Sequence, residues 1–126
     1  MSDDRLPTHL FVMAHVRRFM AEGIDVAVVR KGDPGGGLVV LKLTKFDRQA
    51  GFGPGTETGP GPECRVFTQT RDPDGRMAWF GAQQGAFMPE SEADSYIERA
   101  VNRDPDLWVV EIETADGTNP FEGNII

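Results

Sequence analysis

The chain has 126 residues, of which 39% are hydrophobic and 26% charged, and it carries a formal net charge of -7. These values are typical of one globular domain, and no run of about eighteen apolar residues is present that could cross a membrane. The acidic balance disfavours binding to nucleic acid and the start of the chain does not read as a secretory signal, so we expect one cytoplasmic domain over residues 1–126.

The first expected element is a helix from about Thr8 to Glu22. Pro7 suits the start of a helix and Gly23 suits its end. Apolar residues recur at spacings of three and four, which predicts a stripe facing the core, made of Val12, Met13, Val16, Phe19 and Met20. His15 is expected on the opposite face of the helix.

Two strands are expected next, over residues 24–30 and 38–46, because both segments are rich in Val, Ile and Leu. The glycine-rich segment 31–37 lies between them and has strong turn chemistry, so we expect the two strands to form a hairpin. Both runs are more continuously apolar than alternating, which predicts that they lie near the centre of a sheet with helices covering both faces.

The segment at about 49–63 is rich in Gly and Pro and has no periodicity, so we expect a flexible loop there. Strands over 64–70 and 76–81 flank the sequence Asp72-Pro73-Asp74-Gly75, which favours a type I turn. A second hairpin is therefore expected after the loop.

A second helix is expected over 89–102, ending before Pro105, and a last strand over 107–114. The tail after Gly117 is expected to be irregular. The predicted fold is α+β: a five-stranded, mostly antiparallel sheet, built from two hairpins and a C-terminal strand and covered by two helices.

Four sequence blocks suggest a family. They are Leu6-Pro7-Thr8, Val29-Arg30-Lys31-Gly32-Asp33, residues 68–75 and residues 104–113. In this order they resemble a bacterial domain of unknown function, family 1491, over about residues 5–123. The resemblance implies one compact domain, and it assigns no activity and no catalytic residue.

Acidic side chains suggest one enzymatic possibility. Asp33, Glu111 and Glu113 could hold a divalent metal in a metal-dependent hydrolase or nuclease. A separate nuclease-like arrangement would cluster Glu22, Asp33 and Lys42 around such a metal. The usual carboxylate two positions before the lysine is missing, however, because Val40 stands there. The single cysteine, Cys64, cannot form an internal disulfide or a multi-cysteine metal site. We therefore expect no metal and no cofactor.

Arginine and tryptophan residues make the stronger candidate site. If several converged, guanidinium groups would bind a carboxylate or phosphate and an indole ring would offer a stacking face. The candidate ligand-binding residues are Arg30, Asp33, Arg71, Trp79, Arg99 and Trp108.

The sequence lacks a nucleophile–base pair, a metal-binding cluster and a phosphate-binding loop, which favours a small noncatalytic binding or protein-interaction module. The partner would be a protein or a small anionic ligand. A homodimer formed through an exposed strand is a further possibility.

Overall fold

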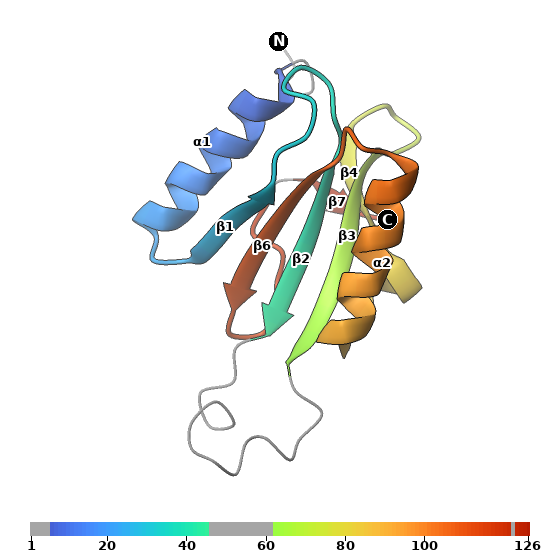
Figure 1. Ribbon diagram of the computed structural model, residues 1–126. Helices are drawn as coiled ribbons and strands as arrows, with labels where there is room; N and C mark the ends of the chain where they lie inside the picture. Colours follow the sequence, from blue (N-terminus) through green and yellow to red (C-terminus); the bar gives the residue numbers. More distant parts are fainter. Residues whose placement is uncertain (1–5, 46–61, 122) are drawn as a thin grey trace.

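The computed structural model describes residues 6–45, 62–121 and 123–126. They form one twisted sheet with a helix on each face (Figure 1). The elements are α1 (Thr8–Ala21), β1 (Asp25–Arg30), β2 (Val39–Lys45), β3 (Glu63–Arg71), β4 (Met77–Gly81), the 3-10 turn η3 (Ala82–Gly85), β5 (Met88–Pro89), α2 (Glu90–Arg103), β6 (Trp108–Thr114) and β7 (Asn124–Ile125). No helix in the described part of the chain is long and apolar enough to span a membrane. The loop expected at 49–63 lies outside the described residues, except for its last two residues, Pro62 and Glu63, of which Glu63 begins β3.

The sheet has seven strands in the order β1-β6-β2-β3-β4-β7, and the short β5 pairs with the start of β3. The α+β class with two helices is confirmed, and so is the hairpin of β3 and β4. The expected count of five strands is wrong, because the short strands β5 and β7 also join the sheet. The sheet is mixed: β2 pairs with β6 and β4 pairs with β7 in parallel, while the other pairings are antiparallel as expected.

The predicted hairpin of the first two strands is wrong, because β6 lies between β1 and β2. It pairs antiparallel with β1, where Asp25 is opposite Glu113, and parallel with β2, where Lys42 is opposite Glu111. The connection over 31–38 is long enough to cross two strand spacings of about 4.8 Å each. A strand that is apolar on both faces buries most apolar surface at the centre of a sheet. The first residues of β6 are buried on both faces, whereas the residues of β1 alternate between exposed and half-buried.

Two hydrophobic layers lie on opposite faces of the sheet. On β2, Val39, Leu41 and Leu43 pack toward α1, while Val40 packs toward α2. The expectation that both faces of this strand are covered is therefore confirmed. It is wrong for β1, which forms an edge of the sheet.

Helix α1 ends as predicted at Gly23, whose φ of +78° favours glycine. The N–H of Ile24 donates to the carbonyl of Phe19 (2.9 Å) and the N–H of Gly23 donates to that of Met20 (3.1 Å), which is the Schellman pattern.

The predicted core stripe of α1 is wrong at two positions. Met13 and Met20 are exposed, at 37% and 65%, while Phe11 and His15 are buried in their place. His15 therefore lies on the core face and not on the opposite one. Its Nδ1 lies 2.8 Å from the carbonyl oxygen of Phe11, so Nδ1 carries the proton.

The tail contributes to the core, although it was expected to be irregular. Phe121 is buried and its ring lies 4.6 Å from that of His15 and 5.6 Å from that of Trp79. The tail then adds β7 at the edge of the sheet, next to β4. These contacts fix the last part of the chain against α1 and β4.

Helix α2 covers the other face of the sheet. Glu90 and Glu92 lie in its first turn and Arg103 in its last, which suits the helix dipole. It buries Ala93, Ile97 and Ala100 against the apolar residues of β2, β3 and β6.

Candidate functional site

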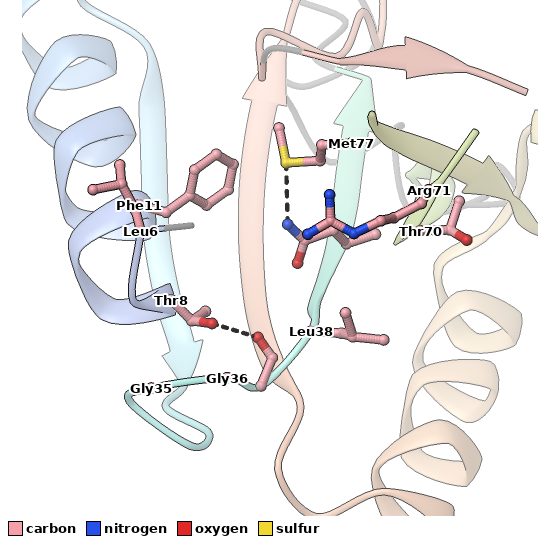
Figure 2. A pocket seen from close by; sticks show the side chains of 11 residues that line it. Leu6, Thr8, Phe11, Gly35, Gly36, Leu38, Thr70, Arg71 and Met77 are labelled. Atoms are coloured by element: carbon pink, nitrogen blue, oxygen red, sulfur yellow. Dashed lines mark hydrogen bonds between the residues drawn. The ribbon is translucent and has the colours of Figure 1, made fainter. Parts of the chain in front are cut away.

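A pocket of about 480 Å³ lies at the end of the sheet where β2 begins. Three parts of the chain form it: the start of α1, the turn before β2 and the β3–β4 hairpin. Its lining residues are Leu6, Thr8, Phe11, Gly35, Gly36, Gly37, Leu38, Gln69, Thr70, Arg71 and Met77 (Figure 2). Pockets for small molecules commonly measure about 300–1,000 Å³, so this volume suits a small ligand.

One wall of the pocket is the glycine-rich turn, which neighbouring segments hold in place. The hydroxyl of Thr8 donates to the carbonyl of Gly37 (2.7 Å), and the N–H of His9 donates to the carbonyl of Pro34 (3.0 Å). At Gly37 a Cβ would clash with the carbonyl of Asp106, so only glycine fits. The sequence places glycine here because the 104–106 turn packs directly against this backbone.

The turn does not present a set of unpaired amides for a phosphate. The N–H of Gly36 donates to the carboxylate of Asp33 (2.9 Å) and that of Gly37 donates to the carbonyl of Asp33 (3.2 Å). Both amides are therefore satisfied within the turn itself.

Gln69 forms part of the pocket wall on β3. Its Oε1 accepts from the N–H of Val39 (3.1 Å) and its Nε2 lies 3.1 Å from Sδ of Met77 (Figure 2). The amide group thus ties the start of β2 to β4, and this arrangement fixes the shape of the cavity before any ligand enters.

Arg71 supplies the positive charge of the pocket. It lies at the end of β3, and its Nη1 donates to the carbonyl of Gly75 (2.9 Å) within the hairpin. Figure 2 shows its side chain beside Met77, across the pocket from Leu6, Thr8 and Phe11. A guanidinium opposite apolar side chains can bind the carboxylate of a ligand whose remainder is apolar. Arg71 is the only ionisable residue among the described residues of the lining.

Three of the predicted site residues are brought together beside the pocket. Nε1 of Trp108 donates to the carbonyl of Asp33 (2.8 Å), and Nη2 of Arg30 donates to the carbonyl of Pro105 (2.8 Å). These contacts join the glycine-rich turn to the turn before β6. Trp108 is buried, so it holds the turn through its indole N–H and offers no stacking face to a ligand.

The other two residues lie elsewhere. Trp79 is fully buried in the layer under α1, and Arg99 is exposed on α2, on the opposite face of the sheet from the pocket's α1 wall. Of the six predicted residues, the structure therefore places only Arg71 in the lining.

Sequence reasoning missed the residues that give the pocket its shape, among them Thr8, Phe11, Leu38, Gln69 and Met77. They come from segments that are distant in sequence and have no shared motif. Two of the family blocks were available signals, since Leu6-Pro7-Thr8 contains Thr8 and residues 68–75 contain Gln69, but neither block names a role.

The acidic residues considered for a metal site do not gather. The carboxylate of Asp33 accepts a hydrogen bond from Gly36 within the glycine-rich turn. Glu111 lies instead 3.6 Å from the ammonium of Lys42, on the α2 face of the sheet. Among the described residues, no three His, Cys, Asp or Glu side chains are placed to hold a metal ion. The geometry thus gives no support to the metal-dependent alternative.

Lys42 instead occupies the centre of a charge network. Its side chain is only 5% exposed, and its Nζ lies 2.9 Å from Glu90 and 2.7 Å from Asp94. Burial lowers the pKa of Lys42, but the hydrogen bonds of Asp94 and Glu90 and the charge of Glu111 outweigh it and raise that pKa. In the sequence, the signal for this buried charge was a lysine inside the apolar run from Val39 to Leu43.

The sequence matches the family model of the protein of unknown function DUF1491 over residues 6–122. This chain belongs to that family. A comparison with curated proteins gives no match.

Two solved structures of a DUF1491 family protein from Caulobacter crescentus agree with this assignment. The crystal structure has 32% identity and a TM-score of 0.72, with 96% of this chain and 99% of that chain covered. The NMR structure has 34% identity and a TM-score of 0.71, with 97% of each chain covered. A solution structure of an Agrobacterium tumefaciens protein has 22% identity and a TM-score of 0.64, covers 94% of this chain and 99% of its own, and shows similarity of fold alone.

Proposed function

We propose that this DUF1491 protein is a noncatalytic, cytoplasmic binding module whose pocket takes a small ligand with a carboxylate and an apolar body. The observation that carries the proposal is the position of Arg71 across the cavity from Leu6 and Phe11. Such a lining suits binding, because the carboxylate would reach the guanidinium while the apolar body replaces water against the opposite wall.

The hydrogen bonds of the pocket support this function. Thr8 already bonds the glycine-rich turn, and Gln69 already bonds Val39 and Met77, so little ordering remains when a ligand enters. The lining offers no general base and no activated nucleophile among its described residues, which suits recognition more than acid–base or covalent chemistry.

The first test is a titration of the ¹⁵N-labelled protein with phenylacetate, a small carboxylate with an apolar ring. We expect amide shifts at Leu38, Gln69 and Thr70, and weaker binding of the uncharged phenylacetamide. The substitution Arg71→Gln should weaken phenylacetate binding about tenfold, which corresponds to ~1.4 kcal/mol for the loss of a charge-assisted hydrogen bond.

Arg76→Gln is the matched control, because Arg76 is an exposed arginine of the same hairpin outside the lining. Equal affinity of the wild type and the Arg71→Gln variant for phenylacetate would contradict the proposal, as would shifts confined to α2. Native mass spectrometry of the protein from its own host would then identify the natural ligand by its mass.

A further inference from the structure

The outer face of α1 carries apolar side chains that no described part of the chain covers. Leu10, Met13 and Met20 are 48%, 37% and 65% exposed, although the helix already buries another apolar face against the sheet. A surface helix of a monomer usually has a polar outer face, so a second apolar stripe indicates an interaction surface. This surface is separate from the pocket, since none of these three residues lines it.

The spacing of the stripe gives the shape of its partner. Positions 10, 13, 17 and 20 follow steps of three, four and three, and Leu6 precedes them by four. This is the repeat of a helix that packs along a second helix at a small crossing angle. We define this set, Leu10, Met13, Arg17 and Met20, as the α1 seam.

Arg17 gives the chemistry of the partner. It is exposed, and its side chain makes no hydrogen bond or ion pair with any residue that the structure describes. The neighbouring Arg18 already has partners within the chain: its guanidinium donates to the carbonyl of Pro120 (3.2 Å) and lies 5.2 Å from the ring of Phe19. A charged residue within an apolar seam needs an opposite charge across the interface.

The charge distribution agrees with an acidic partner. Helix α1 contains two arginines and no acid, so its balance is +2, and the rest of the chain therefore carries -7 minus +2, or -9. The α1 seam is thus an apolar and basic strip on an acidic protein.

We propose that the α1 seam binds an amphipathic helix of a partner protein, with apolar residues opposite Leu10, Met13 and Met20 and an aspartate or glutamate opposite Arg17. The helix is 14 residues long, or about 21 Å at 1.5 Å per residue. An interface of this length is small, so the complex forms and dissociates readily.

A second copy of the chain fits this surface less well. Helix α1 has no acid to offer, so a parallel pair would oppose Arg17 to itself and an antiparallel pair would oppose it to Met13. The α2 helix could supply acids, but its large apolar residues face the sheet and leave no seam for Met13 and Met20.

An anionic membrane also fits less well. Recognition of anionic lipid usually rests on about four to eight basic residues, whereas α1 has two, one of which is folded onto Phe19. The remaining charge of -9 would be repelled by the lipid surface.

The test uses the full chain and two designed helical peptides of about three heptads, each with leucine at the seam positions except one central position. One peptide has glutamate there and the other has lysine. We expect fluorescence anisotropy to show that the glutamate peptide binds at least tenfold more tightly than the lysine peptide. Arg17→Glu should reverse that preference, and Met13→Ser should weaken both peptides at least fivefold.

Arg76→Glu, an exposed charge reversal away from α1, is the control and should change neither affinity. Thermal melting of each variant checks that the fold is retained. Loss of the preference on Arg17→Glu without its reversal, or no binding of either peptide below millimolar concentration, overturns the proposal. A wild-type dimer in native mass spectra that Met13→Ser dissociates would assign the seam to a second copy. Sedimentation with vesicles of phosphatidylcholine and phosphatidylserine would assign it to a membrane, and both results overturn the proposal.

Discussion

The charge network around Lys42 gives a prediction that can be worked out from the structure. The ammonium lies almost fully inside the protein, with 5% of the side chain exposed, whereas the side chains of Glu90, Asp94 and Glu111 are 41%, 56% and 45% exposed. The perturbation is to neutralise the two hydrogen-bonding acids, singly and together, as Glu90→Gln and Asp94→Asn. Removing one acid leaves the ammonium another close partner, while removing both leaves only Glu111 at 3.6 Å.

The expected losses follow from this difference. A hydrogen bond to a charged group contributes about 1.5–3 kcal/mol when buried, and exposure of the acids reduces this to about 1 kcal/mol for each single substitution. A buried charge that loses its partners costs about 3–5 kcal/mol. The double variant should therefore lose about 3 kcal/mol, which exceeds the sum of the single losses by about 1 kcal/mol.

The assay is urea unfolding at pH 7, followed by circular dichroism. In a Lys42→Met background the buried charge is gone, so the same acid substitutions should change the free energy of unfolding by less than about 0.5 kcal/mol. Glu98→Gln is the control, because Glu98 is an exposed acid of α2 outside the network. Additive losses in the double variant, or equal losses with and without Lys42, would show that the two acids do not share the burden of a buried ammonium.

Three more predictions concern stability. Phe121→Ala should lower the free energy of unfolding by about 3–4 kcal/mol in urea titrations, because the ring is buried against His15 and Trp79. Gln84→Gly should raise it by about 0.5–1 kcal/mol in thermal melts, because Gln84 has a φ of +62° that strains any residue with a Cβ. The raised pKa of Lys42 means that the unfolded chain releases this proton first, from its usual 10.5 upward. The network's contribution is complete below about pH 10 and falls at higher pH, so the wild type should lose stability faster than Lys42→Met does.

Each of these predictions has a control. Phe80→Ala should cost less than about 1 kcal/mol, since that ring is 55% exposed, and an equal cost at Phe121 would contradict its place in the core. Ser95→Gly within α2 should destabilise by about 0.5 kcal/mol, so the same sign at Gln84 would count against backbone strain. If the wild type and Lys42→Met lost stability at the same rate above pH 10.5, Lys42 would have its ordinary pKa in the folded protein.

The elements themselves followed well from local signals. Pro7 and Gly23 bound the first helix, and Asp72 to Gly75 form the turn of the β3–β4 hairpin. Periodicity was a less reliable guide to which face of a helix is buried, since Met13 and Met20 were expected in the core and are exposed. Both apolar stripes of α1 have helical spacing, and the sequence contains no signal that says which of them meets the sheet.

The candidate site was only partly predictable for a related reason. Arg71 could be singled out as a guanidinium on a regular element, but its neighbours in the pocket come from α1 and from the turn before β2. The partners of Lys42 come from α2 and β6, far along the chain. Contacts between distant segments depend on the packing of the whole sheet, which no local pattern encodes.

Composition, turn chemistry and periodicity thus determined one α+β domain, two helices and most strand positions, because each rests on neighbours within a few residues. The order of the strands was decided by tertiary structure. Strand β6 lies between β1 and β2 because its first residues are buried on both faces, whereas β1 has one exposed face and suits an edge. The insertion of β6 places Glu111 beside Lys42, and it places the 104–106 turn against the glycine-rich turn. The charge network of Lys42 and the wall of the pocket therefore both depend on the order of the strands.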